Sequence, residues 1–214
     1  MLLLGGLVRS HRAEGDRATN DIDTTIYAER SSRPQLTMLA TLGLFAFYVG
    51  SEVSVGQWTF SILTEDRDVS TTAAGIAVGT YWGGLTAGRF ALGMLDRRVH
   101  PLWLLRVSVV VAVGAAWWLW TGGTGSLWAL PALGLAFSGM FPAAVMLSSS
   151  WLGPERLGRA VGYQLAASSL GAIAASALLG IVADNRGLGA VAGAIALLVV
   201  GMAIAQVALE ATVR

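Results

Sequence analysis

The chain has 214 residues, of which 55% are hydrophobic and only 13% are charged, and its formal net charge is +1. A soluble domain carries about 25% charged residues, so this composition, together with the long apolar blocks described below, excludes an ordinary soluble fold. The small net charge gives no support for a nucleic-acid partner. The absence of Cys excludes disulfides and thiolate chemistry.

Residues 1–35 are predicted to form a polar cytoplasmic segment with a short apolar start, and residues 36–214 a transmembrane domain. The apolar run 2–8 is too short to span a bilayer, which takes about 20 residues. It is interpreted as the tail of a helix that begins earlier, or as a frayed hydrophobic end. Residues 9–33 contain five Arg offset by five acids and show no apolar periodicity.

Six apolar segments follow, each long enough to cross about 30 Å of hydrocarbon as a helix. Barrel strands are not expected, because they would alternate in polarity over roughly 10 residues. Short polar or turn-rich connections separate the segments. The predicted spans are 36–63, 72–95, 102–121, 127–148, 157–182 and 188–209. The predicted fold class is therefore an all-α membrane protein, a bundle of six transmembrane helices.

The 14 Arg residues are distributed unequally between the two ends of these spans. If the N-terminus lies inside, ten Arg fall in inner segments and two, Arg67 and Arg186, fall in outer loops. The positive-inside rule then predicts that both termini are cytoplasmic. The predicted location is the cell membrane, the inner membrane of a bacterium.

Small residues recur at helix-packing intervals. Gly75, Gly79 and Gly83 lie four residues apart in the second span and are followed by Gly84 and Gly88. Small residues at this spacing let helix backbones approach closely in lipid. We therefore expect these glycines to face another helix of the bundle. The fifth span has a similar pattern at Ala167, Gly171 and Ala175. The fourth span is predicted to be kinked by Pro131, Gly134, Gly139 and Pro142.

Glu52 lies near the middle of the first span, in the run YVGSEVSVGQW. A charge at the centre of a helix costs about 2.5–3.5 kcal/mol on insertion scales for Arg, Lys or Asp, so such a group normally faces a polar interior. Burial disfavours the ionised form, which lets a carboxyl group bind and release a proton. Two interpretations stay open: a substrate or proton site, and a neutral or paired Glu that fixes helix packing.

Three further residues of the first span are candidates for the same site. Tyr48 lies one turn before Glu52 on the same helical face. Gln57 lies about 140° away on an ideal helix, so it lines the same cavity only if this Gly- and Ser-rich helix is irregular. Trp58 is interpreted either as a stacking surface for a substrate or as an interfacial anchor.

In the second span, Trp82, Thr86 and Arg89 form one helical stripe. Arg89 either extends to the inner interface or pairs with an acid on a neighbouring helix or with an anionic substrate group. Tyr81 and Trp82 could stack on a sugar-like ring, although aromatic pairs in membrane helices more often serve packing. No paired-acid, zinc-ligand or phosphate-loop spacing is present in the sequence, so no enzyme activity, cofactor or metal is predicted.

These residues lie in two runs, YVGSEVSVGQWTFSILTED and GTYWGGLTAGRFALGMLDRR, which resemble the seventh and eighth helices of the major facilitator superfamily. The runs GLAFSGMFPAAVM and PERLGRAVGYQLAASSLGAIAASALLG resemble its tenth and eleventh helices. Within the superfamily, the likeness is strongest to fucose-permease-like sugar transporters. The resemblance covers residues 35–214.

The resemblance implies a twelve-helix fold of two six-helix halves around a central cavity, working by alternating access. This chain would then be the C-terminal half, with residues 1–8 ending the sixth helix and residues 9–33 forming the central loop. Glu52, Gln57 and Trp58 match positions of the seventh helix that face the cavity.

The connection after the second span resembles the family's G-x-x-x-D-R gating motif through Gly93, Asp96 and Arg97. It has one residue fewer between Gly and Asp, and it lacks the later Gly. A six-helix half cannot form both walls of a cavity. The implied partners are therefore the lipid bilayer, a small-molecule substrate, and a missing N-terminal half or a second copy of the chain.

The sequence therefore predicts a secondary transporter, or its C-terminal half, for a small polar solute. A sugar substrate and coupling to protons are both compatible with the residues. The alternatives are a non-transporting membrane scaffold or inactive truncated remnant, and an enzyme embedded in the membrane.

Overall fold

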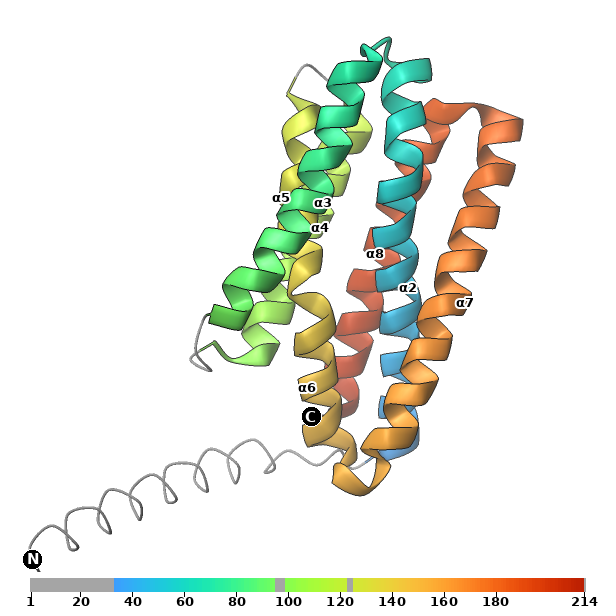
Figure 1. Ribbon diagram of the computed structural model, residues 1–214. Coiled ribbons are helices and arrows are strands. Elements are labelled where there is room, and N and C mark those ends of the chain that lie inside the picture. Colours follow the sequence, from blue (N-terminus) through green and yellow to red (C-terminus); the bar gives the residue numbers. More distant parts are fainter. Residues whose placement is uncertain (1–32, 95–98, 123–124, 214) are drawn as a thin grey trace, which may run out of the picture.

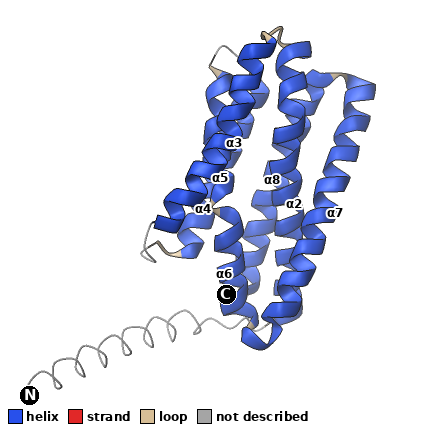
Figure 2. Ribbon diagram, viewed as in Figure 1, coloured by secondary structure: helices blue, strands red, loops and turns tan. Residues whose placement is uncertain are grey.

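The computed structural model describes residues 33–94, 99–122 and 125–213, and this part of the chain is helical throughout apart from its short connections (Figure 1, Figure 2). The helices run up and down along one long axis. In chain order they are α2 (Pro34–Ser61) with a final π-helical turn (Ile62–Asp66), α3 (Thr71–Met94), α4 (Pro101–Thr121), a 3-10 turn (Ser126–Trp128) leading into α5 (Ala129–Ser138), α6 (Met140–Leu152), α7 (Pro154–Arg186) and α8 (Leu188–Val213).

Proline and glycine set most of the helix boundaries. Proline fits the first turn of a helix, where its missing N–H would have no partner, and it stands there at Pro34, Pro101 and Pro154. Glycine readily adopts the positive φ that ends a helix, and it does so at Gly122, Gly153 and Gly187, with φ of 75°, 83° and 78°. The predicted turns between spans are therefore confirmed at these positions.

Five of the six predicted spans correspond to helical segments that are long and apolar enough to cross a membrane. The sixth, α3, has 24 residues and so measures about 36 Å, which is also a spanning length. It is less apolar because six glycines and Arg89 interrupt its hydrophobic sequence. One side of a membrane helix with this composition is expected to pack against other helices instead of facing lipid.

The helices pack as two groups that meet along the length of the bundle. α2 packs mainly on α7 and α8, whereas α3 packs mainly on α5. α4 contacts α5 on one side and α8 on the other, and α6 bridges towards α4 and α7. Figure 1 shows α3, α4 and α5 together on one side and α2 and α7 on the other. The site described below lies where α2 and α3 face each other.

The predicted glycines of α3 divide into two groups, because Gly84 and Gly88 contact α5 whereas the first three contact no other helix. A Cβ on Gly84 would lie 2.8 Å from the Pro131 carbonyl oxygen, and one on Gly134 would collide with the Tyr81 carbonyl. By contrast, a Cβ on Gly79 would meet nothing within 4 Å. The same holds for the other two glycines of the predicted packing stripe, Gly75 and Gly83. That stripe therefore lies on an open face of α3, and the prediction that it packs within the bundle is wrong.

The fifth-span prediction and the kink are both confirmed. A Cβ on Gly171 of α7 would collide with the backbone of Ala46 in α2, so these two helices touch backbone to backbone. The fourth span is divided at Gly139 into α5 and α6, with Pro142 close behind the break.

Two arginine side chains join neighbouring helices. Arg106 of α4 donates to Glu210 of α8 through Nε at 3.0 Å and Nη2 at 2.6 Å. Near the opposite end, Arg67 donates to the Leu119 carbonyl at the end of α4 at 2.6 Å and to Ser126 Oγ at 3.2 Å. Burial lowers the pKa of the Arg67 guanidinium, and nearby Asp66 acts against this effect. A cation at the C-terminus of α4 is favourable for the helix dipole.

Candidate solute site

Glu52 and Arg89 face each other across the boundary between α2 and α3. Arg89 Nη2 lies 3.5 Å from Glu52 Oε1, at the outer limit of a hydrogen bond. The Glu52 side chain is 13% exposed, whereas that of Arg89 is 51% exposed. The second carboxylate oxygen of Glu52, Oε2, is buried and has no hydrogen-bond partner among the described residues. Of the open interpretations of Arg89, the structure shows pairing with an acid on a neighbouring helix.

Two buried tyrosines lie beneath this pair. The Tyr81 hydroxyl donates to the backbone carbonyl of Glu52 at 2.7 Å, which ties α3 to α2. Tyr48, one turn before Glu52, donates to the backbone carbonyl of Phe137 in α5 at 3.3 Å. Neither ring reaches the surface, since Tyr48 is 3% and Tyr81 0% exposed. The predicted stacking role of Tyr81 and direct substrate contact by Tyr48 are therefore not supported by their positions.

Trp82 is the aromatic residue that the site presents at the surface. Its side chain is 44% exposed and lies over Gly56 of α2, where a Cβ would collide with the indole ring. The ring also meets Tyr81 edge to face, with centroids 5.1 Å apart. Gly56 thus lets an aromatic surface from α3 lie flat beside α2, one turn beyond Glu52.

Gln57 lies on the other edge of the exposed face of α2. Its Oε1 accepts a hydrogen bond from Ser176 Oγ of α7 at 2.8 Å. α2 is a continuous α-helix from Pro34 to Ser61, and its irregular turn comes only at Ile62–Asp66. The predicted irregularity around Glu52 is therefore absent. The two polar residues flank the exposed face of α2, with Glu52 towards α3 and Gln57 towards α7.

Trp58 does not belong to this face. It is partly buried against the core, its indole Nε1 is enclosed without a hydrogen-bond partner among the described residues, and its ring lies near Gly180 of α7. Both predicted roles, substrate stacking and interfacial anchoring, stay predictions. The ring fills space between α2 and α7, because a Trp one residue after Gln57 points about 100° away from it.

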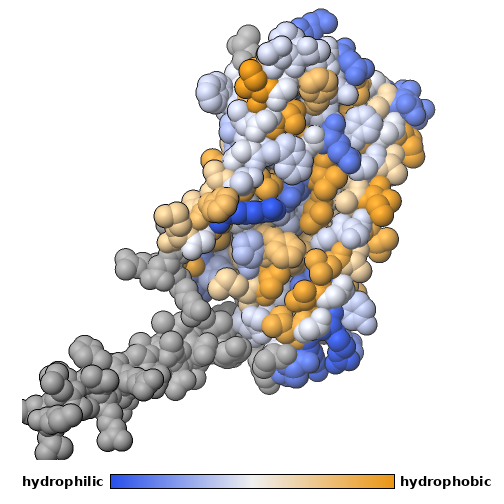
Figure 3. Space-filling model, viewed as in Figure 1, coloured by the Kyte–Doolittle hydropathy of each residue, from blue (hydrophilic) through white to orange (hydrophobic). Residues whose placement is uncertain are grey.

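The exposed face of α3 continues this polar surface. At 100° per residue, Gly75, Gly79, Trp82, Thr86 and Arg89 share one side of the helix, and all five are exposed. Figure 3 shows hydrophilic side chains at mid-height on the viewed face, with apolar side chains on either side. A charged and aromatic strip at this depth distinguishes the face from an ordinary lipid-facing surface.

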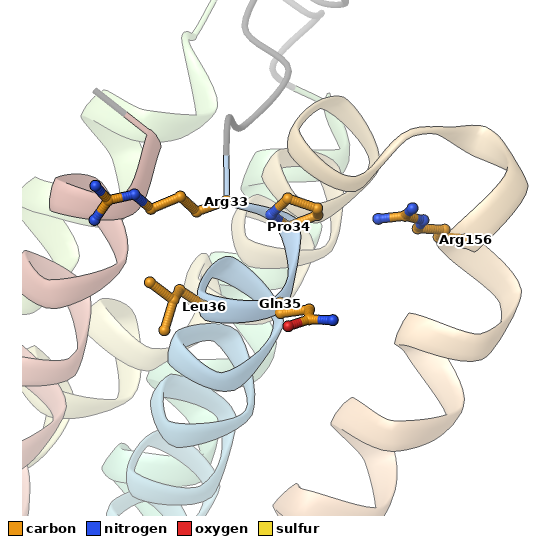
Figure 4. A pocket seen from close by; sticks show the side chains of 5 residues that line it. All are labelled: Arg33, Pro34, Gln35, Leu36 and Arg156. Carbon is orange, nitrogen blue, oxygen red and sulfur yellow. The ribbon is translucent and has the colours of Figure 1, made fainter.

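A cavity of about 450 Å³ lies elsewhere, around the start of α2. Its lining residues are Arg33, Pro34, Gln35, Leu36 and Arg156. It is about 27 Å from Glu52 along α2, given 18 residues at 1.5 Å each. Figure 4 shows the Arg33 and Arg156 side chains on opposite sides of Pro34 rather than converging on one point. We therefore do not assign the solute site to this cavity.

Sequence reasoning missed two partners of the site. Ser176 gives no signal in the sequence, because Ser is common among the small residues of membrane helices. The Phe137 carbonyl is a backbone group and has no signal of its own in the sequence. Only the predicted kink close to it could have indicated a carbonyl open to a side-chain donor. Of the predicted gating residues, Gly93 is exposed near the end of α3. Asp96 and Arg97 lie outside the described residues.

The chain is similar to curated sugar transporters over about half of its length. It is 33% identical over 119 residues to a glucose/galactose transporter of Brucella abortus, which covers 54% of this chain and 29% of the relative. It is 30% identical over 119 residues to a putative glucose/galactose transporter of Helicobacter pylori, covering 54% and 28%. A third relative, bypass of stop codon protein 6 of Saccharomyces cerevisiae, is 38% identical over 60 residues, covering 28% and 12%.

The matched region spans less than a third of the length of each of these relatives. No family model matches the chain. The spanning helices and the similarity to transporters agree on the class of protein. The chain is a multi-pass α-helical membrane protein similar to glucose/galactose transporters.

Proposed function

We propose that the chain is one six-helix unit, the C-terminal half, of a secondary transporter for a neutral sugar. The observation that carries this proposal is a strip across one face of the bundle, formed by the exposed side chains of Arg89, Trp82 and Gln57 and the partly buried Glu52 between them. Ionisable residues within membrane helices mark solute and ion pathways far more often than lipid-facing surfaces. The similarity to glucose/galactose transporters supports the same solute class.

The charges of the site favour a neutral solute. Glu52 and Arg89 lie 3.5 Å apart and cancel each other, so the strip offers hydrogen bonds without a net charge. Glu52 and Gln57 supply acceptors and Arg89 supplies donors, which match the hydroxyl groups of a sugar. Trp82 adds an exposed apolar ring surface of the kind that packs against a pyranose face.

The same face is proposed to pack against a second six-helix unit. Arg89 is 51% exposed at a place where hydrocarbon would otherwise surround it, which is costly for a guanidinium group. Gly75 and Gly79, about three to four turns earlier on the same face of α3, allow another helix to come close. The relatives are more than three times as long as the matched region, which leaves enough chain for a second six-helix unit within one protein. A second copy of this chain is the other candidate for that wall.

Uptake by the host tests the proposed function. Cells that produce the chain are expected to take up labelled glucose or galactose several-fold faster than cells lacking its coding sequence. A Trp82→Ala variant should reduce uptake because it removes the stacking surface. Trp103→Ala is the matched control, since Trp103 is equally an exposed indole but lies on α4, away from the site. Equal sugar uptake with and without the gene would favour the scaffold interpretation.

We also propose that the ends of the bundle carrying Asp68 and Asn185 face outwards and that both termini are cytoplasmic. The support is the placement of Arg33, Arg156 and Arg159 at the other end. Because the chain has no native Cys, single cysteines report orientation directly. Asp68→Cys and Asn185→Cys should react with an impermeant thiol reagent in intact cells, and Arg156→Cys only after lysis. The reverse labelling would invert the topology.

A further inference from the structure

The segment formed by α5 and α6 is interrupted for an identifiable reason. Pro142 has no N–H, so the carbonyl of Ser138, four residues earlier, lacks its helical donor. At Gly139, a Cβ would lie 3.1 Å from a side-chain atom of Leu92 and 3.2 Å from side-chain atoms of Leu104. The break thus lies where α3 and α4 press closely on the chain. Its backbone is less well satisfied than that of a regular helix.

Tyr48 connects this break to the solute site. Its buried side chain reaches from α2 to α5, where the hydroxyl donates to the Phe137 carbonyl at 3.3 Å. The ring packs edge to face on Phe137, with centroids 5.9 Å apart. A typical O–H···O bond measures about 2.7–2.8 Å, so this bond is long and weak. Glu52 lies one turn later on the same face of α2, so its carboxylate is the next acceptor along that face.

The Tyr48 hydroxyl therefore has one proton and two competing acceptors. A carboxylate is a stronger acceptor than a backbone carbonyl, and Glu52 Oε2 lacks a hydrogen-bond partner among the described residues. Among the described residues, the ionisable side chains beside Glu52 are Tyr48, one turn earlier on α2, and Tyr81 and Arg89, which reach it from α3. Whatever binds Glu52 Oε2, whether a proton or a solute hydroxyl, removes the stronger competitor for the Tyr48 proton.

The start of α6 can shift slightly when the hydrogen bond of Tyr48 changes. An apolar gap, too narrow to admit a water molecule, lies beside it. Its lining residues are Leu44, Phe45, Tyr48, Leu105, Met140 and Ala144. A packing defect of this kind leaves neighbouring side chains without part of their contacts, so a small shift there costs little. Tyr48 itself forms part of its wall, next to the first residue of α6.

We propose that Tyr48 is a positioning residue that transmits the state of the Glu52 carboxylate to the break between α5 and α6. When Glu52 is ionised and free, the hydroxyl turns towards the carboxylate, and the Phe137 carbonyl loses this side-chain donor and keeps the backbone N–H of Gly139. When a proton or solute hydroxyl satisfies Glu52, Tyr48 donates to Phe137 and fixes the break. The inference rests on the proposed function only in taking the occupant of Glu52 to be the transported solute or its coupling proton.

Spin labels across the break test the inference without any transport measurement. Trp128→Cys and Met146→Cys place labels on exposed sites at the start of the α5 segment and within α6, about 27 Å apart if the helix were straight. Glu52→Gln mimics the satisfied carboxyl, so it should shift the label distance. Adding Tyr48→Phe should abolish that shift. A shift that persists with Tyr48→Phe, or no shift at all, overturns the proposal.

Transport gives the second readout. Tyr48→Phe should lower the uptake rate about fivefold, as expected for losing one working hydrogen bond, while sugar affinity stays the same. Tyr81→Phe is the matched control, because its hydroxyl also binds a backbone carbonyl but at α2 rather than at the break. Weaker sugar binding by Tyr48→Phe would make Tyr48 a solute contact instead. If the wild type binds no sugar, the proposed function fails while the label experiment still decides the role of Tyr48.

Discussion

Gly134→Leu is expected to destabilise the bundle by more than the roughly 1–3 kcal/mol of an ordinary overpacked core site. A Cβ at this position already collides with the Tyr81 carbonyl and lies 2.9 Å from the Leu85 backbone nitrogen. These are backbone atoms of α3, which cannot move aside without disturbing that helix. We expect a large loss of monodisperse protein in detergent and a lower melting temperature, measured by fluorescence-detected size exclusion after heating.

Gly79→Leu is the matched control for this change. It introduces the same side chain on α3, but nothing lies within 4 Å of the position a Cβ would take. The melting temperature should therefore stay at the wild-type value, although uptake should fall if the second unit packs on this face. An equal loss of stability in both variants would contradict the arrangement of α3 on α5.

The glycines of α3 show why sequence spacing predicts helix packing only in part. The spacing Gly75, Gly79, Gly83 is a helix-packing pattern, but Gly84 and Gly88 repeat the same interval on another side of α3. Spacing alone cannot say which side meets a neighbour within the same bundle. In lipid, apolar residues cover both the protein-facing and the lipid-facing sides, so the hydrophobic pattern does not choose between them.

Helix boundaries were predictable because they depend on local backbone chemistry. Proline in the first turn and glycine at positive φ act within a few residues of their own position, so the turns could be found from the sequence. The break at Gly139 followed from the same reasoning. The lower hydropathy of α3 is also a local property. Which side of α3 packs against other helices depends on the assembled bundle.

The site was predictable only in part. The cost of burying a carboxylate singled out Glu52, and the need for a counter-charge made Arg89 a reasonable partner. Side-chain direction was harder, since Trp58 follows Gln57 by one residue and yet points into the bundle. Contacts such as Gln57 with Ser176 join residues 119 positions apart, and no local signal encodes them.

A variant of the Arg106–Glu210 pair tests whether an effect of changing Glu52 is specific to the solute site or follows from the loss of any paired carboxylate. Arg106 and Glu210 form two short hydrogen bonds between α4 and α8, on helices that do not contribute to the exposed strip. Glu210→Gln keeps the shape of the side chain and removes its charge, as Glu52→Gln does at the site. It therefore controls for the loss of one carboxylate that pairs with an arginine of a neighbouring helix, with that arginine left in place.

Glu52→Gln is expected to abolish uphill accumulation of the sugar in membrane vesicles while leaving exchange of labelled for unlabelled sugar largely intact. An amide keeps the shape of the carboxyl group and most of its hydrogen bonding, but it cannot bind and release a proton in the working pH range. Exchange needs the solute site alone, whereas accumulation needs the proton cycle as well. Glu210→Gln should leave both activities coupled, even if it lowers stability. A parallel fall of accumulation and exchange in Glu52→Gln would assign the carboxylate to solute binding, and unchanged pH-dependent uptake would remove Glu52 from the transport site.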